Sequence, residues 1–323
     1  MLGITRRRFI QYSALAASVS PLLGSTSKDG PLPIGFSTLG CPAWDWYKIL
    51  DFVKQNGFST VELRELQGTM DLPSRPEFAP ERIEQSRKDL AARGLRISCV
   101  SSSANMHDTD PQKHEAQLAD ARKFIDLASG LGAPYVRVFG NKIVGERAGA
   151  VKNIAQSLRS LGEYSGPKNV TVVIESHGDF TDSPTLRGVL EGADSPHVAL
   201  LWDAHHTFVS GREDPDFTVS QLGKYIRHTH LKDSIQKGDD IQYVLTGRGQ
   251  VPVKRQVAAL AGMDYTGSYS FEWEKVWHPE LEEPEIAFPD YARVMREYLS
   301  AVGLNRRDND RILWLQQESR YDR

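Results

Sequence analysis

The sequence has very little cysteine and no large excess of either charge. Its 323 residues include only two cysteines, Cys41 and Cys99, which is too few for a disulfide framework. The formal net charge is −3, so the protein lacks the excess of positive charge that typically attracts nucleic acid or an anionic membrane. Low-complexity tracts are absent, and no hydrophobic run after residue 30 is long enough to cross a bilayer. These absences argue against a disulfide-stapled domain and against a nucleic-acid-binding protein.

The first 28 residues have the features of an export signal. Residues 5–10 contain the basic triplet Arg6, Arg7 and Arg8, and a short apolar run follows at residues 12–23. A charged segment before a short apolar run is typical of a signal peptide. The paired arginines resemble those of a twin-arginine leader, which implies the twin-arginine export machinery as a partner. We therefore expect a periplasmic or otherwise exported protein, tethered to the membrane if the leader is not cleaved.

From residue 33 onward, short apolar runs alternate with longer amphipathic segments. The runs predict strands at residues 34–38, 60–63, 96–101, 135–139, 171–175, 198–203, 226–232 and 268–273. The amphipathic segments predict helices at residues 81–93, 114–131, 151–164, 253–261 and 285–299. Such alternation builds a parallel sheet, and eight strands favour a closed barrel over a doubly wound sheet. The sequence thus predicts one α/β domain, a (β/α)8 TIM barrel at residues 33–302, with a charged tail at 303–323.

Ionisable side chains end the last four predicted strands. In chain order they are Glu175, Asp203, His230 and Glu272. Because the strands of such a barrel all end at one face, these side chains should surround one point. A divalent ion relieves the repulsion among three carboxylates, and oxygen ligands with one imidazole suit Mn²⁺, Mg²⁺, Co²⁺ or Zn²⁺. The pattern predicts one divalent metal ion held by all four; the competing interpretation is unrelated helix caps and ion pairs.

The same residues lie in motifs that resemble the xylose isomerase-like barrel family. That family includes sugar-phosphate isomerases, ketose 3-epimerases and inosose dehydratases. The motifs are Glu175-x-His177, Asp203-x-x-His206, His230-Leu-Lys-Asp233, Gly247-Arg248-Gly249-Gln250-Val251 and Phe271-Glu272. The resemblance covers residues 34–299 and implies the same four metal ligands. It also implies that His206 contacts the substrate and that the glycine loop closes over the site.

The sequence departs from the ketose epimerases after the seventh strand. Their arginine is replaced here by Asp-Ser-Ile-Gln at residues 233–236, and Arg248 is the candidate to stand in for it. Endonucleases of the family need further histidines after the second and third strands, which this sequence lacks. DNA repair is therefore excluded, and we expect the substrate to be contacted by His206, His177, Arg248 and Lys232. His177 has an equally acceptable alternative role, which is to orient the preceding glutamate.

Four further residues near the strand ends have expected supporting roles. His205 and His228 are expected to be packing residues, because strand alternation turns the first away from the site and places the second deeper in the barrel. Asp233 is expected to orient His230. Glu62 is expected to line the pocket.

The chemistry common to such sites is removal of a proton from a carbon next to a carbonyl. Glu175 and Glu272 come from non-adjacent strands and are the expected catalytic base and acid. Reprotonation makes the enzyme an isomerase or epimerase, whereas expulsion of a leaving group makes it a lyase, such as a 3-keto-glycoside eliminase or an inosose-type dehydratase. An exported enzyme should meet a non-phosphorylated sugar, polyol or keto-sugar. A non-catalytic sugar-binding protein is the remaining alternative, and the oligomeric state stays open, a homo-oligomer included.

Overall fold

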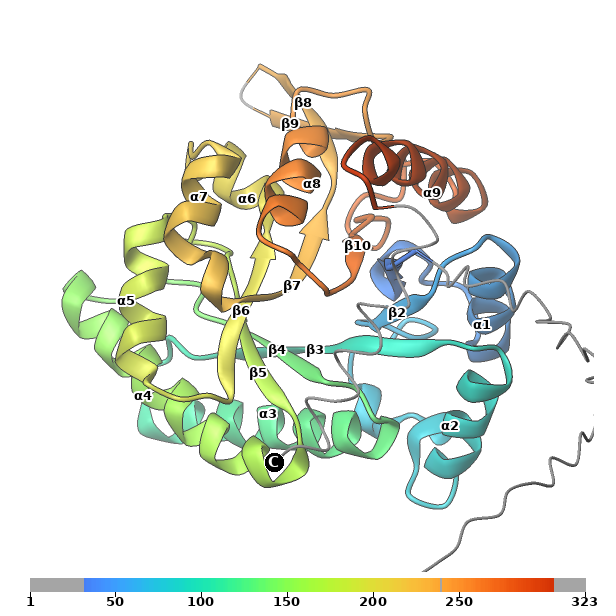
Figure 1. Cartoon of the computed structure of the whole chain (residues 1–323). Helices are drawn as coiled ribbons and strands as arrows, with labels where there is room; N and C mark the ends of the chain where they lie inside the picture. The colour runs from blue at the N-terminus through green and yellow to red at the C-terminus, as the bar shows by residue number, and fades with distance from the viewer. Residues whose placement is uncertain (1–31, 239, 305–323) are drawn as a thin grey trace, which may run out of the picture.

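Eight parallel strands close into a barrel with helices around it (Figure 1). The computed structural model describes residues 32–238 and 240–304. Around the barrel the strands follow the order β1-β10-β7-β6-β5-β4-β3-β2. The predicted (β/α)8 barrel is therefore confirmed. The predicted leader at residues 1–28 and most of the predicted tail lie outside the described residues, so both stay predictions.

The barrel strands match the predicted ones, with ends that differ by up to four residues. They are β1 (Ile34–Ser37), β2 (Thr60–Leu63), β3 (Arg96–Asn105), β4 (Tyr135–Phe139), β5 (Thr171–Glu175), β6 (Val198–Asp203), β7 (Ile226–Leu231) and β10 (Tyr269–Phe271). Neighbouring strands are in parallel register, for example Asp203 of β6 opposite His230 of β7. This register brings the carboxyl ends of the strands to one face of the barrel.

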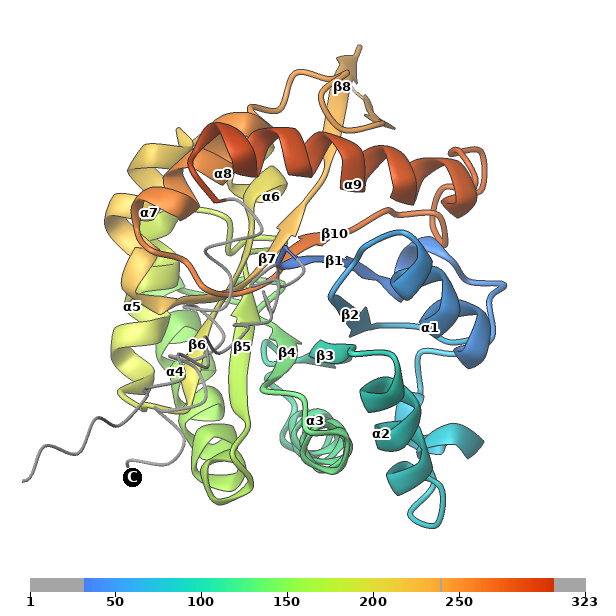
Figure 2. The ribbon, with the colours of Figure 1, turned by 45° about the vertical axis from the view of Figure 1, so that its right-hand side comes forward.

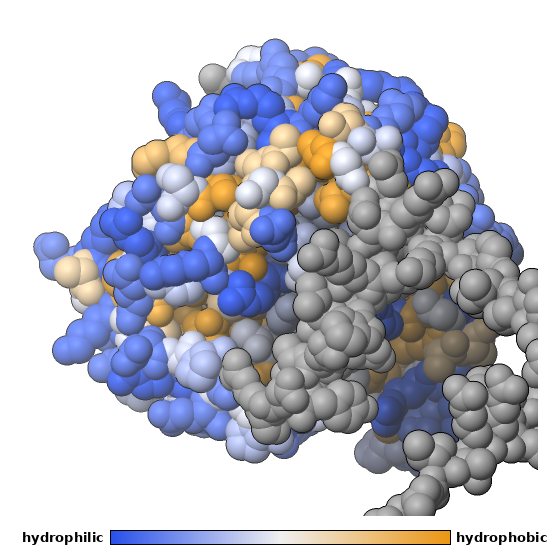
Figure 3. All heavy atoms as spheres, viewed as in Figure 1, coloured by the Kyte–Doolittle hydropathy of each residue, from blue (hydrophilic) through white to orange (hydrophobic). Residues whose placement is uncertain are grey.

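Helices pack on the outside of the barrel. They are α1 (Trp46–Gln55), α2 (Ile83–Ala92), α3 (Pro111–Leu131), α4 (Arg147–Ser165), α5 (Ser183–Ala193), α6 (Ala204–Val209), α7 (Pro215–Leu222), α8 (Val253–Gly262) and α9 (Pro284–Ala301). Local signals set their ends: Asp110 accepts hydrogen bonds from two backbone N–H groups at the start of α3, and Gly132 ends that helix at φ +73°. None of the helices in the described ranges is long and apolar enough to cross a membrane. The face seen in Figure 3 is mostly hydrophilic, as expected where apolar helix sides face the sheet.

A two-stranded hairpin that the sequence did not predict projects beyond the barrel (Figures 1 and 2). Its strands, β8 (Asp233–Lys237) and β9 (Asp240–Val244), pair antiparallel directly after β7. β8 is largely polar, and the apolar residues of β9 alternate with polar ones and are only half buried, so neither strand carries a buried apolar run. Gly238, at φ +64°, supplies the backbone conformation that the turn requires.

Two apolar clusters fill the structure. The larger one includes strand and helix residues from most of the described chain. The smaller one is formed by Cys99, Val173, Ala199 and Leu201. Strand alternation puts Val173 on the same face as Glu175, so this smaller cluster forms a floor inside the barrel beneath the strand ends.

Candidate metal centre

Four side chains meet at the carboxyl ends of β5, β6, β7 and β10. One ligand atom each from Glu175, Asp203, His230 and Glu272 lies within 4.8 Å of the others. From the Nδ1 atom of His230, the nearest carboxylate oxygen of Glu272 is 3.1 Å away, that of Glu175 is 3.7 Å away and that of Asp203 is 3.8 Å away. All four side chains are buried. The structure thus brings together the predicted ligands, which we call the four-ligand cluster; their metal binding stays a prediction.

Glu62, on β2, holds the other side of the His230 ring. Its Oε2 atom lies 2.8 Å from Nε2 of His230 and 2.7 Å from Nε2 of His228, while Oε1 accepts from the Ser101 hydroxyl at 2.8 Å. A carboxylate at Nε2 keeps a proton there, so Nδ1 is the ring nitrogen that can bind a metal once it has lost its own proton. Nδ1 has no hydrogen-bond partner among the described residues. The expectation that Asp233 orients His230 is therefore wrong, because Glu62 does so.

Asp233 instead organises the glycine loop. Its carboxylate accepts hydrogen bonds from the backbone N–H groups of Ser234, Gly247, Gly249 and Val251, at 2.9 to 3.1 Å. A Cβ atom at Gly249 would lie 2.1 Å from Asp233 Oδ1, so glycine is required at that position. The carboxylate satisfies donors that a buried loop would otherwise leave unpaired.

Lys232 places its ammonium group against the cluster. Nζ lies 2.7 Å from Asp203 Oδ2 and 2.8 Å from Glu274 Oε1, and it also contacts the Glu272 carboxylate. The side chain is fully buried. Its ammonium also lies 5.9 Å from the centre of the Tyr243 ring, which the β8–β9 hairpin carries. Lys232 therefore holds two of the four predicted ligands in place, and a contact with substrate stays a prediction.

Arg137 is a buried partner of the cluster that the sequence analysis missed. Its Nε atom lies 3.2 Å from Glu175 Oε2, and its guanidinium stacks 3.9 Å from the centre of the Phe139 ring. Arg64, at the end of β2, lies nearby and donates to the Ser103 hydroxyl at 2.9 Å. One feature of the sequence could have revealed it: a single arginine stands inside the apolar run Tyr-Val-Arg-Val-Phe. A buried charge in a strand usually has a charged partner, so this arginine pointed to a nearby carboxylate.

The charges shift the pKa values of the cluster. Burial raises the pKa of Glu175, but Arg137 and His230 outweigh it and hold that pKa at about 2. For Glu272 burial acts in the same way, and His230 and Lys232 hold its pKa well below the usual range. Burial lowers the pKa of His230, yet the carboxylates of Glu272 and Glu62 raise it well above the ordinary value. For Asp203 burial prevails over Lys232, so its pKa is raised.

The donor set and the charge balance fit a divalent cation. The charged groups in and around the cluster are the carboxylates of Glu62, Glu175, Asp203, Glu272 and the half-buried Glu274 and the cations Arg64, Arg137 and Lys232. With His230 neutral, as it would be when its Nδ1 binds an ion, five carboxylates against three cations leave two negative charges, which one divalent ion would neutralise. Oxygen ligands and one imidazole are also the chemistry that such an ion prefers.

Three further histidines, His177, His205 and His206, lie around the cluster in different ways. His206 Nε2 lies 3.4 Å from Asp203 Oδ2, and the His177 ring meets the His206 ring edge-on at 5.1 Å. Burial, then the charge of Lys232, lowers the pKa of His206 to about 3. His205 is buried and bonded to the Ser234 hydroxyl, as expected for a packing residue.

Arg248 lies apart from these side chains. Its guanidinium is 59% exposed and lies 3.3 Å from Asp290 on α9. In the described part of the chain it shares no hydrogen bond or ion pair with the four-ligand cluster. The structure therefore does not place the Arg248 guanidinium in contact with the four-ligand cluster, and its role as a stand-in for the epimerase arginine stays a prediction.

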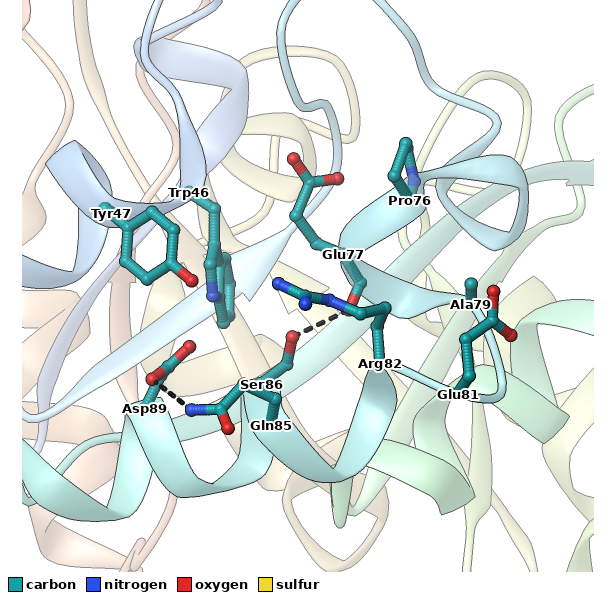
Figure 4. Close-up of a pocket in the computed structure, with 10 residues that line it drawn as sticks. All are labelled: Trp46, Tyr47, Pro76, Glu77, Ala79, Glu81, Arg82, Gln85, Ser86 and Asp89. Carbon is teal, nitrogen blue, oxygen red and sulfur yellow. Dashed lines mark hydrogen bonds between the residues drawn. The ribbon is translucent and has the colours of Figure 1, made fainter.

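A separate pocket of 340 Å³ lies on the side of the barrel (Figure 4). Trp46 and Tyr47 of α1 line one side, and Gln85, Ser86 and Asp89 of α2 line the other. None of its lining residues belongs to the four-ligand cluster. The strand-end geometry, and not this hollow, locates the candidate site.

Comparison with known proteins identifies the fold family. The family described as xylose isomerase-like TIM barrel matches residues 50–298. The chain belongs to this family. The resemblance to the xylose isomerase-like barrels that the motifs suggested is thereby confirmed at the level of the family. A comparison with curated protein sequences finds no match to this chain.

Solved structures of xylose isomerase-like barrels are similar to this chain over most of its length. An IolI protein with a bound zinc atom has a TM-score of 0.71 and 16% identity, covering 83% of this chain and 98% of its own. D-Psicose 3-epimerase with D-tagatose from Clostridium cellulolyticum H10 has a TM-score of 0.66 and 16% identity, covering 82% and 98%. A xylose isomerase-like TIM barrel protein from Mycobacterium smegmatis in complex with magnesium has a TM-score of 0.62 and 19% identity, covering 84% and 96%. At these identities the likeness shows the fold alone.

Proposed function

We propose that this protein is a divalent-metal-dependent isomerase or epimerase that acts on a non-phosphorylated sugar or keto-sugar. The observation that carries the proposal is the four-ligand cluster, in which Nδ1 of His230 faces three carboxylates. Membership of the family supports it, since similar structures include a D-psicose 3-epimerase with D-tagatose and proteins with zinc or magnesium.

The ligands of the ion would be Glu175, Asp203, His230 and Glu272. When bound, a divalent ion polarises adjacent carbonyl and hydroxyl oxygens and so acidifies the neighbouring C–H bond. Glu62 keeps His230 in the orientation that binding requires.

Glu175 and Glu272 are the proposed acid and base. They stand at the ends of β5 and β10, which β7 and β6 separate in the barrel, so they approach the centre from different sides. Both have lowered pKa values and are ionised at neutral pH, so either can take the substrate proton, and the carboxyl group that has taken it up then acts as the acid. Return of this proton to the adjacent carbon gives isomerisation. Delivery of a solvent-derived proton to the other face by the second carboxyl group gives epimerisation, and loss of a leaving group gives elimination.

A substrate without phosphate fits the charges around the centre. Lys232 and Arg137, the buried cations that contact the cluster, are already paired with carboxylates. Neither is available to neutralise a phosphate without breaking such a pair. The proposed export of the protein also favours free sugars as substrates.

The test is proton exchange at carbon. The Mn²⁺-loaded protein is incubated in D₂O with a panel of free sugars, 3-keto sugars and inososes, and the products are followed by NMR. We expect deuterium at a single carbon of one substrate, with an epimer or isomer as product and no exchange after chelation. An eliminated product would make the protein a lyase. Metal binding without exchange across the panel would instead indicate a sugar-binding protein.

We further propose export through the twin-arginine machinery, which rests on residues 5–10. Replacing Arg6 and Arg7 together by lysine keeps the positive charge and should leave the precursor in the cytoplasm. A general secretion signal depends on charge and hydrophobicity and tolerates this exchange. Fractionation of cells that express tagged protein measures the result. Normal export of the double-lysine variant would contradict twin-arginine export.

A further inference from the structure

Three polar side chains form a hydrogen-bond chain beside the four-ligand cluster. We propose that Asn105 and Asn141 are positioning residues that fix the proton of His177 on Nδ1 and leave Nε2 as an acceptor for a substrate hydroxyl. Asn105 ends β3, Asn141 lies two residues beyond β4, and His177 lies two residues beyond β5. The residues of this hydrogen-bond chain therefore come from three consecutive strand ends, at the same face of the barrel as the four-ligand cluster.

At the Asn105 end, a backbone carbonyl group fixes the direction of this hydrogen-bond chain. The side-chain amide of Asn105 meets the carbonyl oxygen of Ser103 at 2.8 Å. A carbonyl oxygen only accepts, so the amide atom that faces it must be the NH₂ group. The other amide atom of Asn105 is therefore its oxygen.

The remaining contacts follow from this one. The Asn105 oxygen lies 2.9 Å from the side-chain amide of Asn141, which must present its NH₂ group there. The oxygen of Asn141 is then left to face Nδ1 of His177, at 3.1 Å. Because that oxygen only accepts, Nδ1 must carry a proton, and a neutral ring then has its lone pair on Nε2.

The backbone around Asn141 is arranged for this contact. Asn141 has φ +65°, a conformation that asparagine tolerates better than most residues. Gly178, at φ +62°, follows His177, and a Cβ atom there would lie 2.2 Å from the Asn141 carbonyl oxygen. Asparagine at residue 141 and glycine at residue 178 thus allow the close approach of the two segments that the hydrogen bond joins.

Nε2 is the nitrogen of His177 that remains available to a ligand. It has no hydrogen-bond partner among the described residues, and the ring packs edge-on against His206, whose Nε2 lies 3.4 Å from Asp203. An acceptor at this place selects a group with a proton to donate. On the proposed function, His177 therefore binds a hydroxyl of the sugar and rejects a keto, ether or fluoro group at the same carbon.

The tautomer can be measured without metal or substrate. The full chain, labelled with ¹⁵N, is examined by long-range ¹H–¹⁵N NMR in alkaline buffer, where neutral imidazoles predominate. The His177→Gln variant identifies the His177 signals. We expect the wild-type protein to show the proton on Nδ1.

Two replacements of Asn141 then test the chain. Asn141→Gly tolerates the positive φ but removes the acceptor, so the Nδ1–H pattern of His177 should be lost in favour of Nε2–H. Asn141→Asp is the comparison variant, because a carboxylate still accepts from Nδ1 and the Nδ1 proton should remain, although the donor to the Asn105 oxygen is lost. A wild-type Nε2–H form, an unchanged pattern in Asn141→Gly, or loss of the Nδ1 proton in Asn141→Asp would each overturn the proposal. These outcomes do not depend on whether the protein binds metal or exchanges protons.

Discussion

The two halves of the barrel contribute different groups to the candidate site. The carboxyl ends of β5, β6, β7 and β10 carry Glu175, Asp203, His230 and Glu272, whose ligand atoms meet at one centre; Glu272 lies one residue beyond β10. β2, β3 and β4 instead supply side chains that hold others: Glu62 on β2 orients His230, and Arg137 on β4 pairs with Glu175. We call β5, β6, β7 and β10 the ligand half of the barrel, and β2, β3 and β4 the supporting half. A centre of this kind depends on both, because a metal ligand must be aimed as well as present.

Removing the charge of a ligand-half carboxylate should have the largest effect. Glu272→Gln keeps the size of the side chain but loses its basicity, so at saturating Mn²⁺ we expect proton exchange to fall by at least about 10²-fold. Deuterium incorporation followed by NMR is the measurement. Metal affinity, measured by calorimetry, should weaken as well.

Glu280→Gln is the matched control for this variant. Glu280 lies in the same loop, with a side chain that is 71% exposed, and pairs with His278. Exchange should stay near the wild-type rate in this protein. If Glu272→Gln also keeps that rate, Glu272 is not the acid or base, and this carboxylate of the ligand half does not take part in proton transfer.

A change in the supporting half should act through the metal. In Glu62→Gln an amide NH₂ group can face Nε2 of His230, which favours a proton on Nδ1 and blocks the ligand position. We expect metal affinity to fall by about 10- to 100-fold, the range found when such outer partners are removed. Calorimetric titration with Mn²⁺ measures it, and Glu81→Gln, the same exchange at an exposed residue, is the control. Equal affinities in the two variants would show that Glu62 does not aim His230.

The link between the halves should also appear in the pH dependence of metal binding. Both ring nitrogens of His230 face carboxylates, which raise its pKa well above the ordinary value against the effect of burial. The metal-free ring is therefore protonated at neutral pH, and the ion must displace the Nδ1 proton. As the pH rises toward this pKa, the competing protonated form becomes scarcer and the affinity should increase, by up to about tenfold per pH unit.

Calorimetry in buffers of different ionisation enthalpy counts the released protons, and we expect about one per ion. Affinity that stays constant across the neutral range, with no proton released, would mean that His230 is not protonated before binding.

The difference between the halves also explains what the sequence could predict. The barrel followed from alternating apolar runs, and Glu175 and Asp203 stood out because each ends such a run. Arg137 and Glu62 lie within or beside apolar runs, where pattern alone does not say which distant residue they meet. Glu62 and His230 are 168 positions apart, so their contact depends on closure of the barrel. The β8–β9 hairpin was missed for a related reason, since neither of its strands carries a buried apolar run.

The glycine loop belongs to neither half, and Arg248 should have the smallest effect. The sequence suggested that this arginine replaces one found in ketose epimerases, but its guanidinium is 59% exposed and pairs with Asp290 on α9. Exposed ion pairs contribute little, so Arg248→Ala should change proton exchange and metal affinity by less than about twofold. Arg137→Lys makes the informative contrast, because a buried guanidinium that pairs with Glu175 and stacks on Phe139 is poorly replaced by an ammonium group. The two variants are compared by deuterium exchange over a range of substrate concentrations. A raised KM in Arg248→Ala would show that the loop moves Arg248 onto the substrate, and the site would then include a third contributing region.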